Sequence, residues 1–214
     1  MPIIDALIFD LDGTLVDSKI SLLMSINFTL RKLKLKEKSF SEIRPYIGIG
    51  LQNLFSKLIE KKNRMLLEEA LNIYNNYYSQ HAFQYVSLYS QTYQILEHFK
   101  EKRKAIVTNR KINSAQAILE KLNISHFFET AIGGDNPLCL KPSACPINKV
   151  LKELNLKKEK TVIIGDMATD ILAGKNSQVI TCAVSSGIGT LEELQETNPD
   201  YLVADLLGLK ELFV

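Results

Sequence analysis

Short apolar runs of strand length recur along this chain and alternate with segments of helical periodicity. The apolar runs lie at 3–9, 104–107, 161–164, 179–184 and 201–203, with a weaker candidate at 128–132. Between them, hydrophobic positions repeat at helical spacing, as in Ala115, Ile118, Leu119 and Leu122. Apolar runs without alternation are typical of strands buried on both faces. The order therefore predicts an α/β fold with a parallel sheet covered by helices on both sides.

The segment 17–86 breaks this alternation, because it shows one helical pattern after another and no convincing strand. Leu51, Leu54, Phe55, Leu58 and Ile59 follow the i, i+3, i+4, i+7, i+8 pattern of an amphipathic helix. A similar pattern runs over 65–78. We expect a helical domain over 17–86, inserted into an α/β core made of 1–16 and 87–214.

Composition narrows the class of protein. The 214 residues are 46% hydrophobic and 23% charged, and no apolar run approaches the roughly 18 residues that cross a bilayer. The net charge is only +2, so no concentrated positive potential indicates a nucleic-acid partner. These values predict an ordinary globular protein that binds neither nucleic acid nor a membrane. They leave open whether the protein is a monomer or a homodimer.

The three cysteines and the N-terminus bear on the cellular compartment. Cys139, Cys145 and Cys182 are odd in number and lack C-x-x-C spacing, so we expect neither a disulfide framework nor a zinc site. The N-terminal residues show no basic segment and no small-residue cleavage site of a secretion signal. Reduced thiols and a cytoplasmic location are the expectation.

Polar side chains follow the apolar runs where the predicted strands end. Asp10 and Asp12 come directly after the first run, and residues two apart in a strand project to the same side. Like charges at short range raise one pKa, so this pair can supply one ionised and one protonated carboxyl group near neutral pH. Such a division suits a nucleophile and an acid.

Other predicted strands end in the same way. The run at 104–107 is followed by Thr108 and Asn109, and the run at 161–164 by Asp166 and Asp170. Lys141 precedes a helical pattern and supplies a cation from a loop. Ligands bind outside the carboxyl ends of open parallel sheets, so we expect these groups to share one pocket.

Several carboxylates beside one lysine require a balancing charge. Mg²⁺ prefers oxygen ligands and is usually held by one or two carboxylates together with a substrate phosphate. The sequence thus predicts a Mg²⁺-dependent site for a phosphate ester, in which Asp10 attacks phosphorus and forms an aspartyl-phosphate.

The motifs "DLDGT", "TN", "KP" and "GDMATD", each after a strand-like run, resemble the four signature motifs of the haloacid dehalogenase-like hydrolase superfamily. Within it, "PYIGIGLQNLF" and "GDMATDILAG" are similar to the phosphoglycolate phosphatase-like group. The resemblance implies a Rossmann-like core with an all-helical cap that closes over the site.

The resemblance also implies a role for each motif residue. Asp10 would be the nucleophile and Asp12 the general acid and base. Thr108 would bind the transferred phosphoryl group with Asn109 close by, and Lys141 would stabilise the charge of that group and the nucleophile. The implied ligands of Mg²⁺ are the carboxylates of Asp10 and Asp166 and the backbone carbonyl of Asp12. Asp170 would orient that metal site without binding the ion directly, either by holding its ligands or through a water molecule.

Other positions allow more than one interpretation. Gly48 and Gly50 match the cap loop of the group and are candidate specificity residues, although G-x-G alone is commonly a turn. Arg110 departs from the group, where a lysine or a small residue is commoner. We interpret the cap tyrosines as packing residues and the loop over 187–189 as a plain connection.

The predicted activity is hydrolysis of a small phosphate monoester, with phosphoglycolate as the first candidate. A sugar-phosphate phosphomutase would use the same core residues. A catalytically idle binding protein on the same fold is the alternative outside the enzymes.

Overall fold

A six-stranded parallel sheet forms the centre of the computed structural model, which describes residues 2–59, 64–81 and 85–214. The strands are β1 (Ala6–Phe9), β4 (Arg103–Val107), β5 (Thr130–Ile132), β6 (Thr161–Gly165), β7 (Ile180–Val184) and β8 (Tyr201–Val203). Their order across the sheet is β5-β4-β1-β6-β7-β8, with every neighbouring pair parallel. All six agree with the apolar runs of the sequence, so the predicted α/β fold is confirmed.

The register of the central strands aligns the ends that carry the motif residues. Phe9 of β1 lies opposite Ile106 of β4 on one side and Ile164 of β6 on the other. Asp10 follows Phe9 directly and its N–H donates to the carbonyl of Ile164 at 2.9 Å. The polar residues after β1, β4 and β6 therefore emerge side by side at one edge of the sheet.

Helices bury both faces of this sheet. Leu7 and Phe9 pack into one core cluster with residues of α5 (Thr92–His98), α6 (Ile112–Lys121) and α10 (Leu209–Leu212). Ile8, one residue away on the strand, packs into a second cluster with α7 (Cys145–Glu153) and α8 (Ala168–Ser177). Successive side chains of a strand point to opposite faces, which explains the unalternating apolar sequence of β1. The helix α9 (Leu191–Glu196) follows β7.

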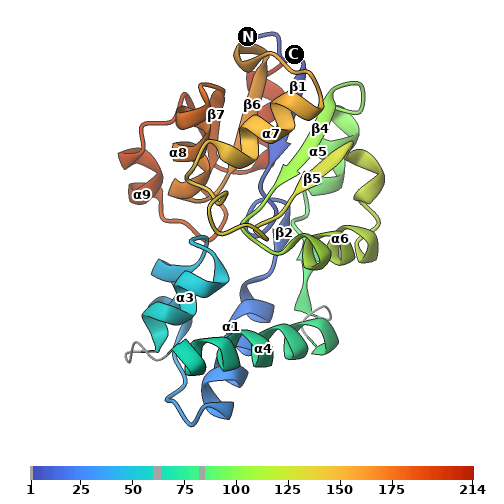
Figure 1. Cartoon of the computed structure of the whole chain (residues 1–214). Coiled ribbons are helices and arrows are strands. Elements are labelled where there is room, and N and C mark those ends of the chain that lie inside the picture. The colour runs from blue at the N-terminus through green and yellow to red at the C-terminus, as the bar shows by residue number, and fades with distance from the viewer. Residues whose placement is uncertain (1, 60–63, 82–84) are drawn as a thin grey trace.

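The helices α1 (Lys19–Lys32), α2 (Phe40–Ile43), α3 (Leu51–Leu58) and α4 (Arg64–His81) lie between β1 and β4 in the chain. In Figure 1 the labelled α1, α3 and α4 lie together below the sheet, beyond the carboxyl end of β1. We call this group of helices the cap. Aromatic rings pack within it: the buried rings of Phe55 and Tyr74 meet with centroids 5.7 Å apart, and the half-buried rings of Phe28 and Tyr77 stack at 3.9 Å.

A short antiparallel ribbon lies where the chain passes from the core into the cap and back. It consists of β2 (Val16–Asp17) and β3 (Ser87–Leu88), paired Val16 to Leu88 and Asp17 to Ser87. Two residues per strand are too few to produce a periodic pattern, so the sequence did not indicate this ribbon. It lies at the expected junctions; the boundaries 17 and 86 as domain limits stay a prediction.

No helix in the described ranges is both long enough and apolar enough to cross a membrane.

Candidate active site

Asp10 and Lys141 form a buried ion pair at the end of β1. The Lys141 Nζ lies 2.6 Å from Asp10 Oδ1 and 2.6 Å from Asp170 Oδ1, and it donates to the Val107 carbonyl at 2.7 Å. Burial lowers the pKa of Lys141, but the two carboxylates outweigh it and the net pKa is raised. The lysine therefore stays cationic and holds two carboxylates in place.

Asp166 lies at the end of β6 and is enclosed by two loops. Its Oδ1 accepts from the hydroxyl of Thr14 at 2.6 Å, and its Oδ2 accepts from the backbone N–H of Ile188 at 2.7 Å. Gly13 and Gly187 leave no room for a side chain, since a Cβ on either would come within 2.1 Å or 2.3 Å of this aspartate. The loop over 187–189, expected to be a plain connection, thus binds a motif carboxylate.

Asp10, Asp166 and Asp170 form a cluster that could hold a metal ion. Each offers a carboxylate oxygen, and these oxygens lie within 4.8 Å of one another. Burial, and the neighbouring carboxylates, raise the pKa of Asp10 well above its usual range despite Lys141. Burial and then Asp170 raise the pKa of Asp166 to about 7. Carboxylates that resist ionisation in this way fit a site for a hard cation.

Asp170 belongs to this cluster, and each of its two carboxylate oxygens also has a partner. Oδ1 pairs with Lys141, and Oδ2 accepts from the backbone N–H of Met167 at 2.9 Å, at the first turn of α8. Both contacts fit the supporting role that the sequence indicates. Of the cluster, Asp10 and Asp166 are the carboxylates expected to touch the metal.

Asp12 has a partner that the sequence did not reveal. Both of its carboxylate oxygens accept from the guanidinium of Arg110, from Nε at 2.8 Å and from Nη2 at 2.7 Å. Burial raises the pKa of Asp12, but Arg110 outweighs it and the net pKa is lowered. The Asp12 side chain is thus turned to an arginine, in keeping with the expectation that only its backbone carbonyl serves the metal.

Thr108 and Asn109 follow β4 and differ in their surroundings. Thr108 is buried, and its hydroxyl accepts from the backbone N–H of Arg110 at 3.1 Å. Asn109 bridges two loops, because its amide nitrogen donates to the carbonyls of Gly48 at 2.6 Å and Lys141 at 2.8 Å, and its oxygen accepts from the Lys141 N–H at 2.8 Å. Asn109 therefore ties the cap to the core, and its role in binding the substrate stays a prediction.

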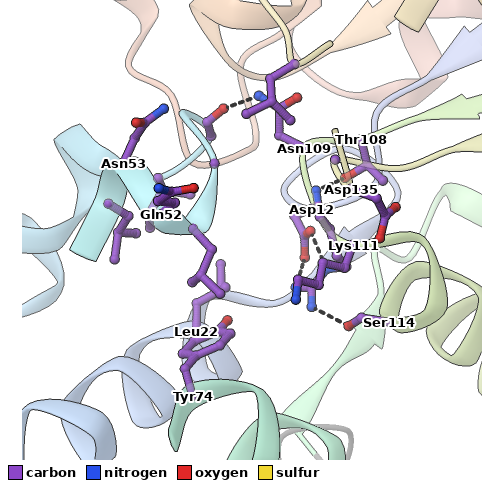
Figure 2. Close-up of a pocket in the computed structure, with 18 of the residues that line it drawn as sticks. Asp12, Leu22, Gln52, Asn53, Tyr74, Thr108, Asn109, Lys111, Ser114 and Asp135 are labelled. Atoms are coloured by element: carbon purple, nitrogen blue, oxygen red, sulfur yellow. Dashed lines mark hydrogen bonds and ion pairs between the residues drawn. The ribbon is translucent and has the colours of Figure 1, made fainter. Parts of the chain in front are cut away.

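A cavity of about 820 Å³ lies between these motif residues and the cap. Figure 2 shows Leu22, Gln52, Asn53 and Tyr74 of the cap opposite Asp12, Thr108, Lys111 and Asp135 of the core. The structure brings all the predicted site residues except Asp166 to the lining of this cavity. Tyr74 and Tyr78 are buried in the cap, as expected for packing, and they also line the cavity.

The two cap glycines lie against the core. Gly48 and Gly50 both have positive φ, at 86° and 89°, which favours glycine. A Cβ on Gly50 would lie 2.8 Å from Leu140 Cδ1, next to the Lys141 loop. A second contact between cap and core is the ion pair of Arg44 with Glu193 of α9 at 2.7 Å. Both glycines line the cavity, and their role in specificity stays a prediction.

The expectation of three reduced cysteines is wrong in this structure. Cys139 and Cys145 form a disulfide, and only Cys182 is free among the cysteines. The bridge spans the loop that carries Lys141. The spacing and the odd number of the cysteines did not indicate this bridge. The conformation of the loop between Leu138 and Ala144 brings the two sulfurs together.

The haloacid dehalogenase-like hydrolase family model matches residues 7–184 of this chain. The chain belongs to this family. It is 32% identical over 210 residues to a phosphoglycolate phosphatase from Aquifex aeolicus (strain VF5), with 96% of each protein covered. It is also 29% identical to the pyrophosphatase PpaX from Bacillus mycoides (strain KBAB4), again with 96% of each covered.

Among solved structures, a haloacid dehalogenase-like hydrolase from Streptococcus pneumoniae superposes with a TM-score of 0.88 at 29% identity, covering 98% of both chains. The recognised family and its phosphoglycolate phosphatase-like group are thereby confirmed. The expected class of enzyme, a phosphoric monoester hydrolase, agrees with this family and these relatives.

The site also contains residues that motif matching did not supply. Thr14 is the last residue of the motif "DLDGT", so its hydroxyl was visible in the sequence, but no partner was assigned to it. Arg110 was visible only as a departure from the group. The backbone of Ile188 carries no side-chain signal at all, so only the fold could place it on Asp166.

Proposed function

We propose that this protein is a Mg²⁺-dependent phosphatase that hydrolyses a small phosphate monoester of the phosphoglycolate type through a phosphorylated Asp10. The observation that carries the proposal is the buried group of Asp10, Lys141, Asp166 and Asp170, of which Asp10, Lys141 and Asp170 line the cavity. The family supports the reaction class, and the relatives support the substrate type.

Asp10 is the nucleophile in this mechanism. One of its oxygens forms a bond to phosphorus while the bond from phosphorus to the ester oxygen breaks. Lys141, 2.6 Å from Asp10, orients this carboxylate and offsets charge on the phosphoryl oxygens. The Thr108 hydroxyl, buried beside Asp10 at the strand ends, donates to the phosphoryl group.

Asp12 handles the protons. It gives a proton to the departing ester oxygen, and in the second step it takes a proton from the water that attacks the phosphorylated Asp10. That attack releases inorganic phosphate and restores the carboxylate. Arg110 lowers the pKa of Asp12, so Asp12 must leave at least one contact with Arg110 and take up a proton from water before it can give a proton to the ester oxygen.

Mg²⁺ would be held by the carboxylates of Asp10 and Asp166 and the backbone carbonyl of Asp12, and when bound it neutralises charge on the transferred phosphoryl group. Thr14 and the Ile188 N–H fix the orientation of Asp166 for this task. Asp170 fixes Lys141 from the other side. The rise in the pKa of Asp10 and Asp166 supports a cation here.

The cap closes the cavity over the substrate in this proposal. Gly48 and Gly50 allow the cap loop to lie against the core. The side-chain amide of Asn109 holds that loop by donating to the backbone carbonyl of Gly48. Exclusion of bulk water by the cap would favour transfer of the phosphoryl group to Asp10 over direct attack of water on the ester. We place this reaction in the cytoplasm, on a soluble metabolite, with the enzyme a monomer or a homodimer; the Cys139–Cys145 disulfide means that reduced thiols do not support this location.

The test uses purified protein with Mg²⁺ or with EDTA. Phosphate release is measured for phosphoglycolate, pyrophosphate and several sugar phosphates, beside the variant Asp10→Asn. Asp5→Asn is the matched control, because Asp5 is exposed and pairs only loosely with Lys160 at 3.5 Å. We expect release that requires Mg²⁺ and Asp10 and is unchanged in Asp5→Asn.

Three results would contradict the proposal. Release that persists in both EDTA and Asp10→Asn would exclude the mechanism. A product that keeps its phosphate and requires a bisphosphate activator would indicate a phosphomutase. Absence of turnover for every ester would favour a binding protein on the same fold.

A further inference from the structure

Arg110 occupies an unusual position between the core and the cap. Its guanidinium lies bidentate on Asp12, donates to the Ser114 hydroxyl at 3.0 Å, and sits 4.5 Å from the ring centroid of Tyr78 in α4. The Arg110 side chain is only 8% exposed, yet it lines the cavity. The guanidinium is therefore held in one place at the wall of the substrate cavity.

The described residues that line the cavity include three cations. Lys141 is bound to Asp10 and Asp170 on the side of the nucleophile. Lys111 is exposed at the rim. Arg110 is the buried cation beside Asp12, the residue assigned to the ester oxygen. In the proposed mechanism, the part of the substrate that follows the ester oxygen lies on the Asp12 side of the cavity, the side that Arg110 lines.

We propose that Arg110 binds a second anionic group on the leaving part of the substrate and thereby selects such esters. This inference rests on the proposed phosphatase function and names the substrate class. The group is a carboxylate or a phosphoryl group, because the planar guanidinium matches both in bidentate geometry. A stacked aromatic ring and Ser114 fix the plane of that fork in advance of binding.

The bidentate contact between Arg110 and Asp12 links the binding of the second anionic group to the release of Asp12 for catalysis. Both oxygens of Asp12 are bound to Arg110, whereas Asp12 needs at least one of them for the ester oxygen. An anionic group on the substrate can replace Asp12 at the guanidinium, since it offers the same charge and the same pair of oxygens. An uncharged leaving group offers no such exchange and leaves Asp12 bound.

Two rival explanations make different predictions. If Arg110 only positions Asp12, its removal slows every ester by the same factor. If Lys111 binds the second anionic group, removal of Lys111 and not of Arg110 abolishes selection. The exposed position of Lys111 makes its charge the weaker of the two, because water screens it.

The experiment compares phosphoglycolate with 2-hydroxyethyl phosphate, which differ only in a carboxylate against a hydroxymethyl group; pyrophosphate tests the phosphoryl alternative. kcat/KM is measured with Mg²⁺ for the wild type, Arg110→Gln, Arg110→Lys and Lys111→Gln. Arg31→Gln is the matched control, since Arg31 is exposed on the cap and pairs with Glu37. Circular dichroism and the unfolding midpoint check that each variant folds.

We expect the wild type to prefer the anionic ester by on the order of 100-fold, the value of one or two hydrogen bonds between charged groups. Arg110→Gln should reduce that preference to a few-fold, and Arg110→Lys should keep an intermediate part of it. Arg31→Gln should keep it entirely. If Arg110→Gln fails to fold, Arg110→Lys decides, because lysine keeps the charge and loses the fork.

Several outcomes would overturn the inference: no preference in the wild type, equal losses on both esters in Arg110→Gln, or loss of preference only in Lys111→Gln. Calorimetric binding of the same two esters to Asp10→Asn, with and without Arg110→Gln, separates it from the proposed function. Turnover that persists in Asp10→Asn would contradict the mechanism, whereas equal affinity of Asp10→Asn for the two esters would contradict the role of Arg110.

Discussion

Replacing Lys141 by methionine tests whether one lysine balances the buried carboxylates. Its Nζ lies 2.6 Å from oxygens of both Asp10 and Asp170, and the side chain is 2% exposed. Removing one partner of a buried ion pair costs about 3–5 kcal/mol, because the remaining charge stays buried without compensation. The free energy of unfolding of a folded domain is typically only about 5–15 kcal/mol. The metal-free variant should therefore lose a large part of its stability near pH 7.5.

The dependence of this loss on pH follows from the pKa of Asp10. Burial raises that pKa and Lys141 opposes the rise, so the variant should carry an even higher pKa at Asp10. A raised carboxylate pKa means that the folded state binds protons more readily than the unfolded state. The stability lost in Lys141→Met is therefore greatest at a pH above the raised pKa of Asp10, and it shrinks as the pH falls and Asp10 becomes protonated. Added Mg²⁺ should shrink it as well, by supplying the missing charge.

The assay is urea unfolding followed by circular dichroism at pH 7.5, 6.5 and 5.5, in EDTA and in Mg²⁺. Lys104→Met is the matched control: Lys104 is also buried, but its Nζ donates to three backbone carbonyls, those of Phe99, Lys100 and Lys102. Its deficit should not shrink on acidification. If the stability lost in Lys141→Met changes neither with pH nor with added Mg²⁺, the charge argument is refuted, and lost packing alone explains the loss.

Three further predictions concern the loops around the site. Asn109→Ala removes the amide that ties the cap to the core, and we expect kcat/KM to fall by on the order of 10-fold with a small change in unfolding midpoint; an unchanged kcat/KM would contradict a role in cap closure. Gly50→Ala should cost about 1–3 kcal/mol in urea unfolding, because its φ of 89° suits only glycine. Adding Leu140→Ala should relieve the 2.8 Å clash and not the backbone cost, so full recovery would disprove the backbone part. Reducing the Cys139–Cys145 bridge, verified by thiol counting, should lower the free energy of unfolding by about 2 kcal/mol; equal stability of both forms would show that the bridge does not constrain the loop.

The position of the motif carboxylates could be predicted from the sequence because it depends on local pattern. A strand buried on both faces must be apolar throughout, so the first polar residue after it marks its end. Asp10 and Asp166 are such residues, and the parallel register of β1 and β6 then places them at one edge. Their proximity required only the correct fold class.

The partners of these residues depended on contacts between segments far apart in the chain. Arg110 meets Asp12 across 98 positions, and Asn109 meets Gly48 across 61. Neither pairing leaves a periodic signal, because each depends on where a loop turns after its strand. The contact by which Asn109 ties the cap to the core was accordingly not predicted from the sequence.

The cysteines show the same limit at short range. Cys139 and Cys145 are six positions apart, and the loop between them decides whether their sulfurs meet. Hydrophobic periodicity and polar strand ends by themselves determined the sheet, the inserted helices and the carboxylates of the site, because burial imposes a pattern on every strand and helix. The tertiary structure alone decided which cation faces which carboxylate, because a side chain selects its partner by distance in space and not along the chain.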